Sequence, residues 1–579
     1  MLDVTFTVKH HRVRTFLIAG NRRKVAWSGD VYLKEILLMT DFKDVIAGGR
    51  TSLGIELGST RIKACLIGED PSTVLGVGSH EWENQLVDRL WTYSLADVWK
   101  GVQAAYAELV ADVERRYGTR LENLGSIGVS AMMHGYLAFD DADELLVPFR
   151  TWRNTNTGAA SAELTELFGV NIPLRWSIAH LHQAVLDGEP HLAQVRSITT
   201  LAGYVHRELT GRNVLGVGDA SGMFPIDSGT SNYDAGLLTR YDTLAAETVP
   251  GLKLSELLPE VLVAGQPAGE LTAEGAALLD PTGGLRPGAL LCPPEGDAGT
   301  GMVATSSVAP RTGNVSAGTS IFAMVVLERP LERVHHELDL VTTPSGDPVA
   351  MVHCNNGASE LAAWVGLFSR FAAASGAVSA SGAALNSDDV FTTLFREALD
   401  GAPDAGGLLA YNHLAGEPIA EIPEGRPLFL RTPDSEFTLA NFMRAQLYGV
   451  FGTLALGMRV LSGEGVELDR MFAHGGMFRT ADVAQRFLSG ALAAPVSVAA
   501  TASEGGPWGM AVLASYASAN AAGDELDLDA YLRKHVFADA EFETTEPDAA
   551  DVAGFATYLD RYHTGLQVEG AAISALPVE

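Results

Sequence analysis

The 579-residue chain is poor in cysteine, in basic side chains and in long apolar runs. Its three cysteines lie far apart and form no CxxC pair, which excludes a disulfide framework and a cysteine-based zinc site. No apolar run reaches the length of about 18 residues that a transmembrane helix needs. Lysine and arginine number 40 against 71 aspartates and glutamates, a net charge of −31. Such an acidic surface repels phosphate backbones and anionic lipid, so we expect neither nucleic acid nor membrane partners.

The first fifty residues differ in character from the rest of the chain. They hold two basic clusters, at residues 10–14 and 22–24, and no apolar core followed by a small-residue cleavage site. A secretory signal is therefore not expected, and the cysteine content fits the reducing cytoplasm. We predict that residues 1–50 form a poorly ordered N-terminal extension. We also hypothesise that Met39 is the natural start, which would make residues 1–38 an upstream addition.

A strand, a glycine turn and a second strand occur in that order twice. The β-rich runs 52–57 and 62–67 flank Gly58-Ser59-Thr60-Arg61, and the runs 313–317 and 321–327 flank Gly318-Thr319-Ser320. Turns of this kind expose consecutive backbone amides that can bind phosphate, although a single one is more often only a hairpin. Two of them, each heading a mixed α/β half, indicate a duplicated architecture with a cleft between the halves. No GxxxxGK[ST] phosphate loop is present.

The remaining pattern alternates strands and helices. We expect a strand at 74–82, a helix from Ser94 to about Tyr117, a buried strand at 126–130, a hairpin around 137–146 and mostly helical structure over 157–211. Further helices are predicted at 296–305, 359–373, 438–461 and 506–517, with strands at 470–473 and 497–500.

Three segments carry residues suited to ligand chemistry. Asp297 lies between glycines at the start of a predicted helix, where it can face a ligand, cap the helix, or do both. His134, Trp152 and Asn154 provide the mixture of ring and amide groups typical of sugar sites, although a lone histidine before glycine is more often structural. No second histidine stands at ligand spacing from His134, so metal binding there has no support. Paired glycines at 475–476 and 505–506 would admit a flat ligand such as adenine, or serve only as turns.

From about Ser52 to Ala517 these residues resemble the FGGY family of carbohydrate kinases, within the actin-like ATPase superfamily. Five segments carry the resemblance in the same order as in the family: 55–63 (IELGSTRIK), 296–298 (GDA), 316–320 (SAGTS), 474–477 (HGGM) and 504–511 (EGGPWGMA). The resemblance implies an α/β fold of two actin-like (ribonuclease H-like) domains with a cleft between them. It assigns 51–304 to an N-terminal sugar-binding domain, 305–546 to a C-terminal nucleotide-binding domain and 547–579 to a C-terminal tail.

The resemblance also implies an ATP-dependent sugar kinase that uses Mg²⁺. Asp297 would be the general base, and the substrate would meet Met133, His134, Trp152, Asn154 and Asp297. The nucleotide would be held by residues of both turns and of the adenosine segment: Glu56, Gly58, Ser59, Thr60, Lys63, Gly318, Thr319, Ser320, Gly475, Gly476 and Met477. Glu56 would reach the metal through a water molecule.

Within the family, Met132-Met133-His134-Gly135 is similar to the QMHG segment of xylulokinases, Trp152-Arg153-Asn154 to their WND and 219–222 to their DASG. A ketopentose is therefore the leading substrate. The chain departs from the pattern at Glu56 and Asn154, where the family has aspartate, and at Met132, where xylulokinases have glutamine. These departures leave open another ketose, such as ribulose, or a polyol. A non-catalytic regulator that binds sugar and ATP, a hydrolytic ATPase and a homodimeric assembly also stay open.

Overall fold

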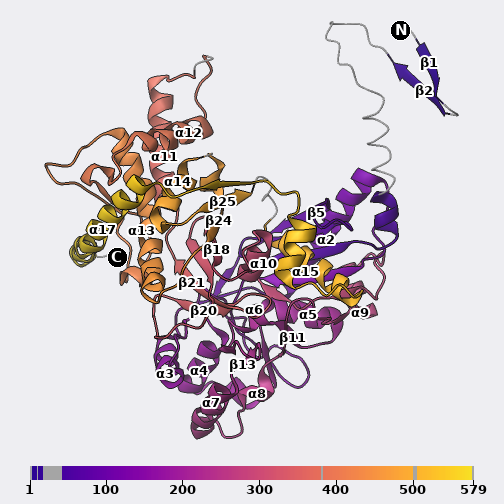
Figure 1. Ribbon diagram of the computed structural model, residues 1–579. Helices are drawn as coiled ribbons and strands as arrows, with labels where there is room; N and C mark the ends of the chain where they lie inside the picture. Colours follow the sequence, from indigo (N-terminus) through magenta and orange to yellow (C-terminus); the bar gives the residue numbers. More distant parts are fainter. Residues whose placement is uncertain are drawn as a thin grey trace.

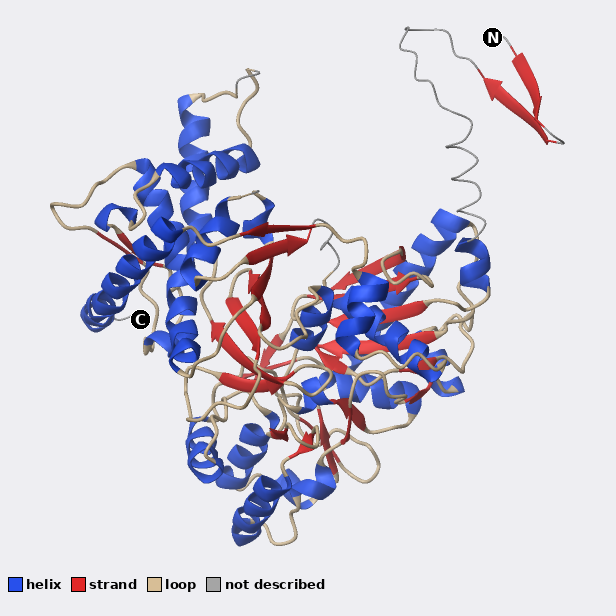
Figure 2. Cartoon of the chain, viewed as in Figure 1, coloured by secondary structure: helices blue, strands red, loops and turns tan. Residues whose placement is uncertain are grey.

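The computed structural model describes residues 3–8, 11–16, 42–379, 382–480, 482–499 and 505–576. The chain folds into two lobes, each built around a seven-stranded sheet with helices packed against it (Figures 1 and 2). The mixed α/β organisation in two halves is thus confirmed. The proposed start at Met39 and Glu504 of the EGGPWGMA segment lie outside the described residues.

The sheet of the first lobe has the order β15-β16-β8-β3-β4-β5, with β17 also paired to β8. Its strands are β3 (Ser52–Leu57), β4 (Arg61–Ile67), β5 (Val74–Glu81), β8 (Ser126–Ala131), β15 (Gly269–Glu270), β16 (Leu290–Leu291) and β17 (Glu295–Gly296). Strand β8 runs parallel to β3 and to β17. The carboxyl ends of these three strands therefore meet at one edge, where the chain continues into Gly58, Met132 and Asp297.

The sheet of the second lobe has the order β20-β21-β19-β18-β24-β25-β26. Its strands are β18 (Thr312–Ala317), β19 (Ile321–Val326), β20 (Asp339–Thr342), β21 (Pro348–Cys354), β24 (Arg470–His474), β25 (Val496–Ala499) and β26 (Phe542–Thr545). Strands β18 and β24 are parallel, with Ser316 opposite His474. The second glycine turn and the Gly475-Gly476 segment consequently leave the sheet side by side.

Helices and short strand pairs complete both lobes. The helices are α2 (Leu95–Tyr117), α3 (Gly158–Phe168), α4 (Ser177–Asp187), α5 (Leu201–Thr210), α6 (Val217–Ala220), α7 (Ala235–Thr248), α8 (Leu254–Leu257), α9 (Ala273–Leu279), α10 (Asp297–Ala304), α11 (Ser359–Ser375), α12 (Ser387–Glu397), α13 (Leu439–Gly463), α14 (Val483–Leu492), α15 (Gly506–Ala521), α16 (Leu528–Tyr531) and α17 (Ala549–Ala575). The pairs are β1 (Asp3–Val8) with β2 (His11–Phe16), β6 (Gln85–Val87) with β7 (Leu90–Thr92), β9 (Leu137–Phe139) with β10 (Ser197–Thr199), β11 (Val214–Gly216) with β14 (Glu260–Leu262), β12 (Ile226–Asp227) with β13 (Asn232–Tyr233) and β22 (Leu409–Tyr411) with β23 (Leu428–Leu430).

Most local predictions match the observed elements, and one interval differs. Ser94 caps α2 by accepting a hydrogen bond from the Asp97 amide, as its position predicted. Residues 157–211, predicted to be mostly helical, also contain β10. This three-residue strand pairs antiparallel with β9, and a strand so short leaves too little periodicity to be seen in the sequence.

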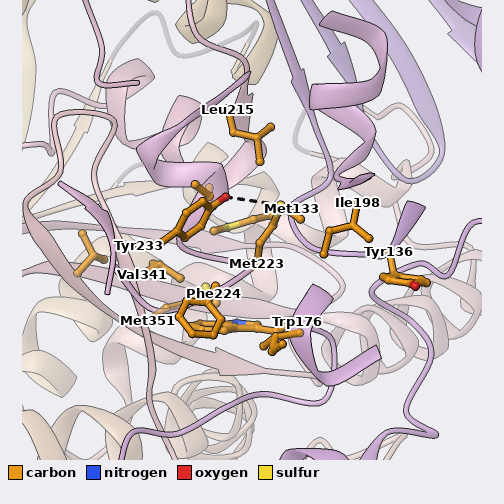
Figure 3. Packing of buried hydrophobic residues seen from close by; sticks show 14 of the residues in the cluster. Met133, Tyr136, Trp176, Ile198, Leu215, Met223, Phe224, Tyr233, Val341 and Met351 are labelled. Atoms are coloured by element: carbon orange, nitrogen blue, oxygen red, sulfur yellow. Dashed lines mark hydrogen bonds between the residues drawn. The ribbon is translucent and has the colours of Figure 1, made fainter. Parts of the chain in front are cut away.

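Helix α15 links the lobes. It follows β25 in the chain but packs on β3 and β8 of the first sheet and crosses α10, as the yellow helix among the purple elements of Figure 1 shows. The largest apolar core likewise draws on both lobes: Met133 and Trp176 from the first, Val341 and Met351 from the second (Figure 3). The two lobes therefore share part of their buried surface.

Parts of the predicted N-terminal extension, residues 1–50, and of the predicted C-terminal tail, residues 547–579, are packed against the two lobes. Val45 and Ile46, from a helical turn at 42–47, are buried in the core of the first lobe. The predicted tail forms α17, whose Phe555, Tyr558 and Tyr562 are buried in the second lobe. Among the residues that the structure describes, no helix combines the length and apolar character needed to cross a membrane.

Candidate functional site

A cavity of about 890 Å³ lies between the two lobes, alongside α10. The first lobe contributes Glu56 and the turn at 69–74 to its wall, and the second lobe contributes Asn314, Ser316 and His474. Gly505, Gly506, Trp508 and residues 534–541 line much of the remaining wall. Of the predicted site residues, Glu56 and Asp297 face this cavity.

Asp297 is the first residue of α10, directly after the carboxyl end of β17. Its Oδ1 accepts a hydrogen bond from the Met133 amide at 3.1 Å, which fixes the carboxylate against the end of β8. Burial, and then the nearby Glu56 carboxylate, raise the pKa of Asp297 to about 6, while the amides of Met133 and Ala298 act in the opposite direction. The group is thus ionised at neutral pH and able to accept a proton.

Glu56 and Lys63 face each other across the β3–β4 pair. The register places the two residues opposite, and Lys63 Nζ lies 3.4 Å from Glu56 Oε2. Burial raises the pKa of Glu56, and Lys63 opposes that shift. Gly506 passes directly over this carboxylate: a Cβ there would lie 2.0 Å from Glu56 Oε1. A side chain at residue 506 would therefore push the Glu56 carboxylate out of its present position.

The first glycine turn is held by three aromatic side chains. The Trp82 indole donates to the carbonyl of Gly58 at 2.7 Å, and the Tyr93 hydroxyl donates to the carbonyl of Ser59 at 2.7 Å. The Trp152 indole donates to Ser59 Oγ at 3.3 Å. Trp152, predicted to meet the substrate, is thus directed toward the predicted phosphate turn.

The second glycine turn is held by backbone groups. The Gly357 amide donates to the carbonyl of Thr319 at 2.7 Å, and the Ala358 amide donates to that of Gly318 at 2.9 Å. Gly318 and Thr319 are exposed, and Ser320 is half-buried. This turn therefore has open sides on which a ligand could lie.

The third glycine segment leaves β24 beside the second turn. Gly475 and Gly476 are exposed, whereas Met477 is buried in the core of the second lobe. Gly475 has a φ of 119° and packs so closely that a Cβ would meet the carbonyl oxygen of Ala317 at 2.2 Å. The backbone of this segment, rather than the Met477 side chain, is thus what a ligand could contact.

His134 and Asn154 are committed to contacts inside the first lobe. His134 is buried, with Nδ1 3.4 Å from the carbonyl of Gly222, and burial holds its pKa well below the ordinary value. The Asn154 amide accepts from the Trp91 amide at 2.8 Å and donates to the carbonyls of Trp91 and Thr151. The structure thus brings Met133 to Asp297 but leaves the Asn154 side chain fully hydrogen-bonded within the protein.

Two buried acids that the sequence analysis did not assign to the site lie behind Asp297. Glu295 accepts hydrogen bonds from the amides of Gly218 and Asp219, at 3.3 and 3.0 Å. Asp219 accepts one from the Thr200 hydroxyl at 2.6 Å. Burial raises their pKa values to about 8 and about 7. The sequence shows that Glu295 lies two residues before Asp297, which could have marked it as a neighbour of the site. The sequence does not show that Glu295 is buried.

The outer wall at 534–541 was also absent from the sequence analysis. Phe537 packs edge-on against Trp508, with ring centroids 5.7 Å apart, and the Trp508 indole donates to the carbonyl of Pro71 at 3.0 Å. These contacts join residues 508 and 537 to the turn after β4. Trp508 lay in a recognisable motif, but nothing in the sequence indicated the residues that it would meet.

Comparisons with known proteins identify the family to which this architecture belongs. The N-terminal domain of the FGGY family of carbohydrate kinases matches residues 51–283, and the C-terminal domain of that family matches residues 313–518. A search of curated proteins gives no match.

Solved structures of the same fold include sugar kinases. A xyloylose kinase from Brucella ovis is 21% identical with a TM-score of 0.71, over 90% of this chain and 100% of that one. A xylulose kinase from Rhodospirillum rubrum is 22% identical with a TM-score of 0.69, over 91% and 99%. A gluconate kinase from Lactobacillus acidophilus is 15% identical with a TM-score of 0.71, over 90% and 99%.

The two lobes are accordingly the two actin-like domains of such kinases. The family models together match more than half of the chain. The chain belongs to the FGGY family of carbohydrate kinases, which are ATP-dependent phosphotransferases that act on sugars.

Proposed function

We propose that this kinase transfers the γ-phosphoryl group of ATP to a hydroxyl of a xylulose-like ketopentose, with Asp297 as the general base. The observation that carries the proposal is the Asp297 carboxylate. It lines the cavity between the lobes, is fixed by the Met133 amide and has a pKa of about 6. A base with this pKa is largely ionised at neutral pH and still basic enough to take a proton in the transition state.

The proposed reaction is a direct displacement. The sugar hydroxyl gives its proton to Asp297 while its oxygen bonds to the γ-phosphorus, and the bond from that phosphorus to the bridging oxygen of ADP breaks. Such transfer depends mainly on positioning and on neutralising phosphate charge. In the proposed reaction Asp297 would position and deprotonate the hydroxyl, and the amides of the two glycine turns, together with the metal ion, would neutralise the phosphate charge.

The nucleotide is assigned to the two glycine turns and the segment after β24. The exposed backbone of Gly318 and Thr319 supports binding of the ATP phosphates, with Ser320 beside them. Gly58, Ser59, Thr60 and Lys63 are assigned to the γ-phosphate side, and Gly475, Gly476 and Met477 to the border of the adenosine. The exposed backbone at 475–476 is compatible with the close approach of a flat base.

Residues present in the cavity fit Mg²⁺ bound together with ATP. Magnesium keeps several waters and needs only one or two protein carboxylates besides substrate phosphates, and Glu56 and Asp297 both face the cavity. Within the described part of the chain, no three His, Cys, Asp or Glu side chains gather in a way that could hold a metal ion by themselves. When bound, the ion would neutralise phosphate charge, and Glu56 would hold it through water.

The sugar is assigned to the first lobe, residues 51–304, and most of the nucleotide to residues 305–546, with the γ-phosphate also reaching the first glycine turn. Met133, His134 and Trp152 are the proposed sugar contacts beside Asp297. Burial holds the pKa of His134 well below its ordinary value, so its ring would act in the neutral form. The xylulokinase-like MHG and DASG segments favour a ketopentose. Asn154 receives a supporting part, because its amide is already hydrogen-bonded to Trp91 and Thr151.

A screen of ADP release tests the proposal. Wild-type protein with ATP and Mg²⁺ is offered ketopentoses, ketohexoses and polyols, and we expect the highest kcat/KM with a xylulose-type sugar. A higher value with ribulose or a polyol would overturn the assigned substrate. Absence of turnover with every sugar would overturn the assigned reaction.

A further inference from the structure

The turn after β21, residues 355–358, is joined to the second glycine turn by backbone contacts. Besides its two hydrogen bonds to the carbonyls of Thr319 and Gly318, it packs without a gap. A Cβ on Gly357 would lie 2.5 Å from the carbonyl oxygen of Gly318 and 2.7 Å from the carbonyl carbon of Ser320. Both atoms belong to the backbone, so neither can turn aside as a flexible side chain would.

Asn356 anchors this turn to the segment 412–417. Its Oδ1 accepts hydrogen bonds from the amides of Leu414 and Ala415, both at 2.9 Å. Its Nδ2 donates to the carbonyl of Ala415 at 3.2 Å and to Glu417 Oε2 at 3.0 Å. Every donor and acceptor of this buried amide is therefore used, an arrangement that fixes position strongly.

The segment 412–417 is held in turn from both sides. Asn412 donates to the carbonyls of Asn356 and Gly357, at 3.2 and 2.8 Å. On the other side, His413 Nδ1 lies 2.8 Å from Glu569 Oε2 of α17, and both side chains are fully buried. A continuous polar path thus runs from the C-terminal helix to the second glycine turn.

We propose that Asn356 and Gly357 are positioning residues of the kinase, which hold the second glycine turn in the geometry that binds the ATP phosphates. This inference rests on the proposed function, because it takes the ATP phosphates to lie on Gly318, Thr319 and Ser320. Neither residue lines the cavity, and both act through the backbone that they support.

The sharpest test is the Gly357→Ala variant. Its new methyl group displaces the second turn, so we expect the affinity for AMP-PNP to fall by about tenfold or more, while that for adenosine stays within about twofold. Titration calorimetry measures both. The matched control is Gly366→Ala on α11, where a Cβ would meet nothing within 4 Å, and which should bind both ligands as wild type does.

A second variant covers the case in which Gly357→Ala does not fold. Asn356→Asp keeps the size of the side chain but removes its two donors and places a second carboxyl beside Glu417. We expect a higher KM for ATP with little change in the KM for sugar. Its control is Asn355→Asp, an exposed neighbour with one hydrogen bond, to the carbonyl of Gly416.

The possible results distinguish a failure of the proposed function from a failure of the positioning role. Wild-type protein that neither turns over sugar nor binds AMP-PNP would refute the proposed function. Active wild-type protein, with Gly357→Ala and Asn356→Asp indistinguishable from their controls, would refute the positioning role alone. Equal losses of AMP-PNP and adenosine binding would also refute it, because they would indicate damage to the whole lobe.

Discussion

The two glycine turns have the same kind of sequence but different supports. The turn at Gly58 is held mainly by three aromatic side chains, Trp82, Tyr93 and Trp152, each through one side-chain hydrogen bond, besides one backbone bond from the Trp82 amide to the carbonyl of Thr60. The turn at Gly318 is held by backbone amides and by direct backbone packing against Gly357. The side-chain contacts of the first turn can be removed one at a time by substitution, whereas the backbone contacts of the second turn are disturbed by displacing the backbone at Gly357.

The edges that carry the two turns also differ in charge. The edge of the first sheet is acidic, with Glu56 and Asp297 at the cavity and with Asp219 and Glu295 buried behind them. The edge of the second sheet contributes Asn314, Ser316 and His474, and burial lowers the pKa of His474, which favours its neutral form. This contrast fits a division in which the first lobe accepts the proton beside the γ-phosphate, and the second lobe binds the rest of the phosphate chain.

The largest effect on turnover is expected at Asp297, the proposed proton acceptor of the first lobe. Asp297→Asn keeps the shape of the side chain but removes its basicity, so kcat should fall by about 10²–10⁴-fold. Binding of AMP-PNP should change little, because the nucleotide is assigned to other groups. Coupled ADP release and titration calorimetry give the two values.

A control for the loss of charge is Asp234→Asn, the N-cap of α7 outside the cavity. It should keep wild-type kcat. Turnover of Asp297→Asn at the rate of this control would remove Asp297 from the mechanism.

The next effect concerns the stability of the lobe that carries the second turn. Asp551 of α17 is buried between Arg444, which is also buried, and Arg486. Asp551→Asn leaves the Arg444 charge without its partner, and breaking a buried pair in this way costs about 3–5 kcal/mol. Scanning calorimetry should show an unfolding transition at a clearly lower temperature.

The matched variant in the first lobe is Glu122→Gln. Glu122 forms an exposed pair with Arg286, and exposed pairs contribute little to stability. Equal shifts in the two variants would show that α17 does not stabilise the second lobe more than a surface contact would.

A smaller effect is expected at the first turn. Tyr93→Phe removes one hydrogen bond to Ser59 and leaves the indoles of Trp82 and Trp152 in place. One hydrogen bond contributes about 0.5–1.5 kcal/mol, so the KM for ATP should rise by about tenfold at most. Steady-state kinetics at saturating sugar measures it. Steady-state kinetics of Gly357→Ala under the same conditions gives the comparison, and a larger rise in Tyr93→Phe than in Gly357→Ala would reverse the contrast between the two turns.

The sequence predicted the local structure of both glycine turns. It did not predict which distant residues hold them in place. The strands around Gly58 and Gly318 have β-rich sequences and glycine punctuation, which act over a few residues. The contacts of Trp152 with Ser59 and of Trp508 with Pro71 join residues far apart, in the latter case 437 positions. A single sequence carries no signal for such pairs. The wall at 534–541 and the packing of α17 were missed for the same reason.

The smallest effect is a shift in pH dependence that links Glu56 to Asp297. Burial, and then the Glu56 charge, raise the pKa of Asp297 to about 6. Because the base acts in its ionised form, kcat/KM for the sugar should reach its maximum well above pH 6 and fall as the pH drops below 6.

Glu56→Gln removes the neighbouring negative charge and lowers the pKa of Asp297. The acid limb of the profile, the pH range in which kcat/KM falls, should therefore move to lower pH. Both proteins use the same ATP at saturating Mg²⁺, so the difference in limb position reports on the protein. An unchanged limb, or one that moves to higher pH, would mean that Glu56 does not act on Asp297 through its charge.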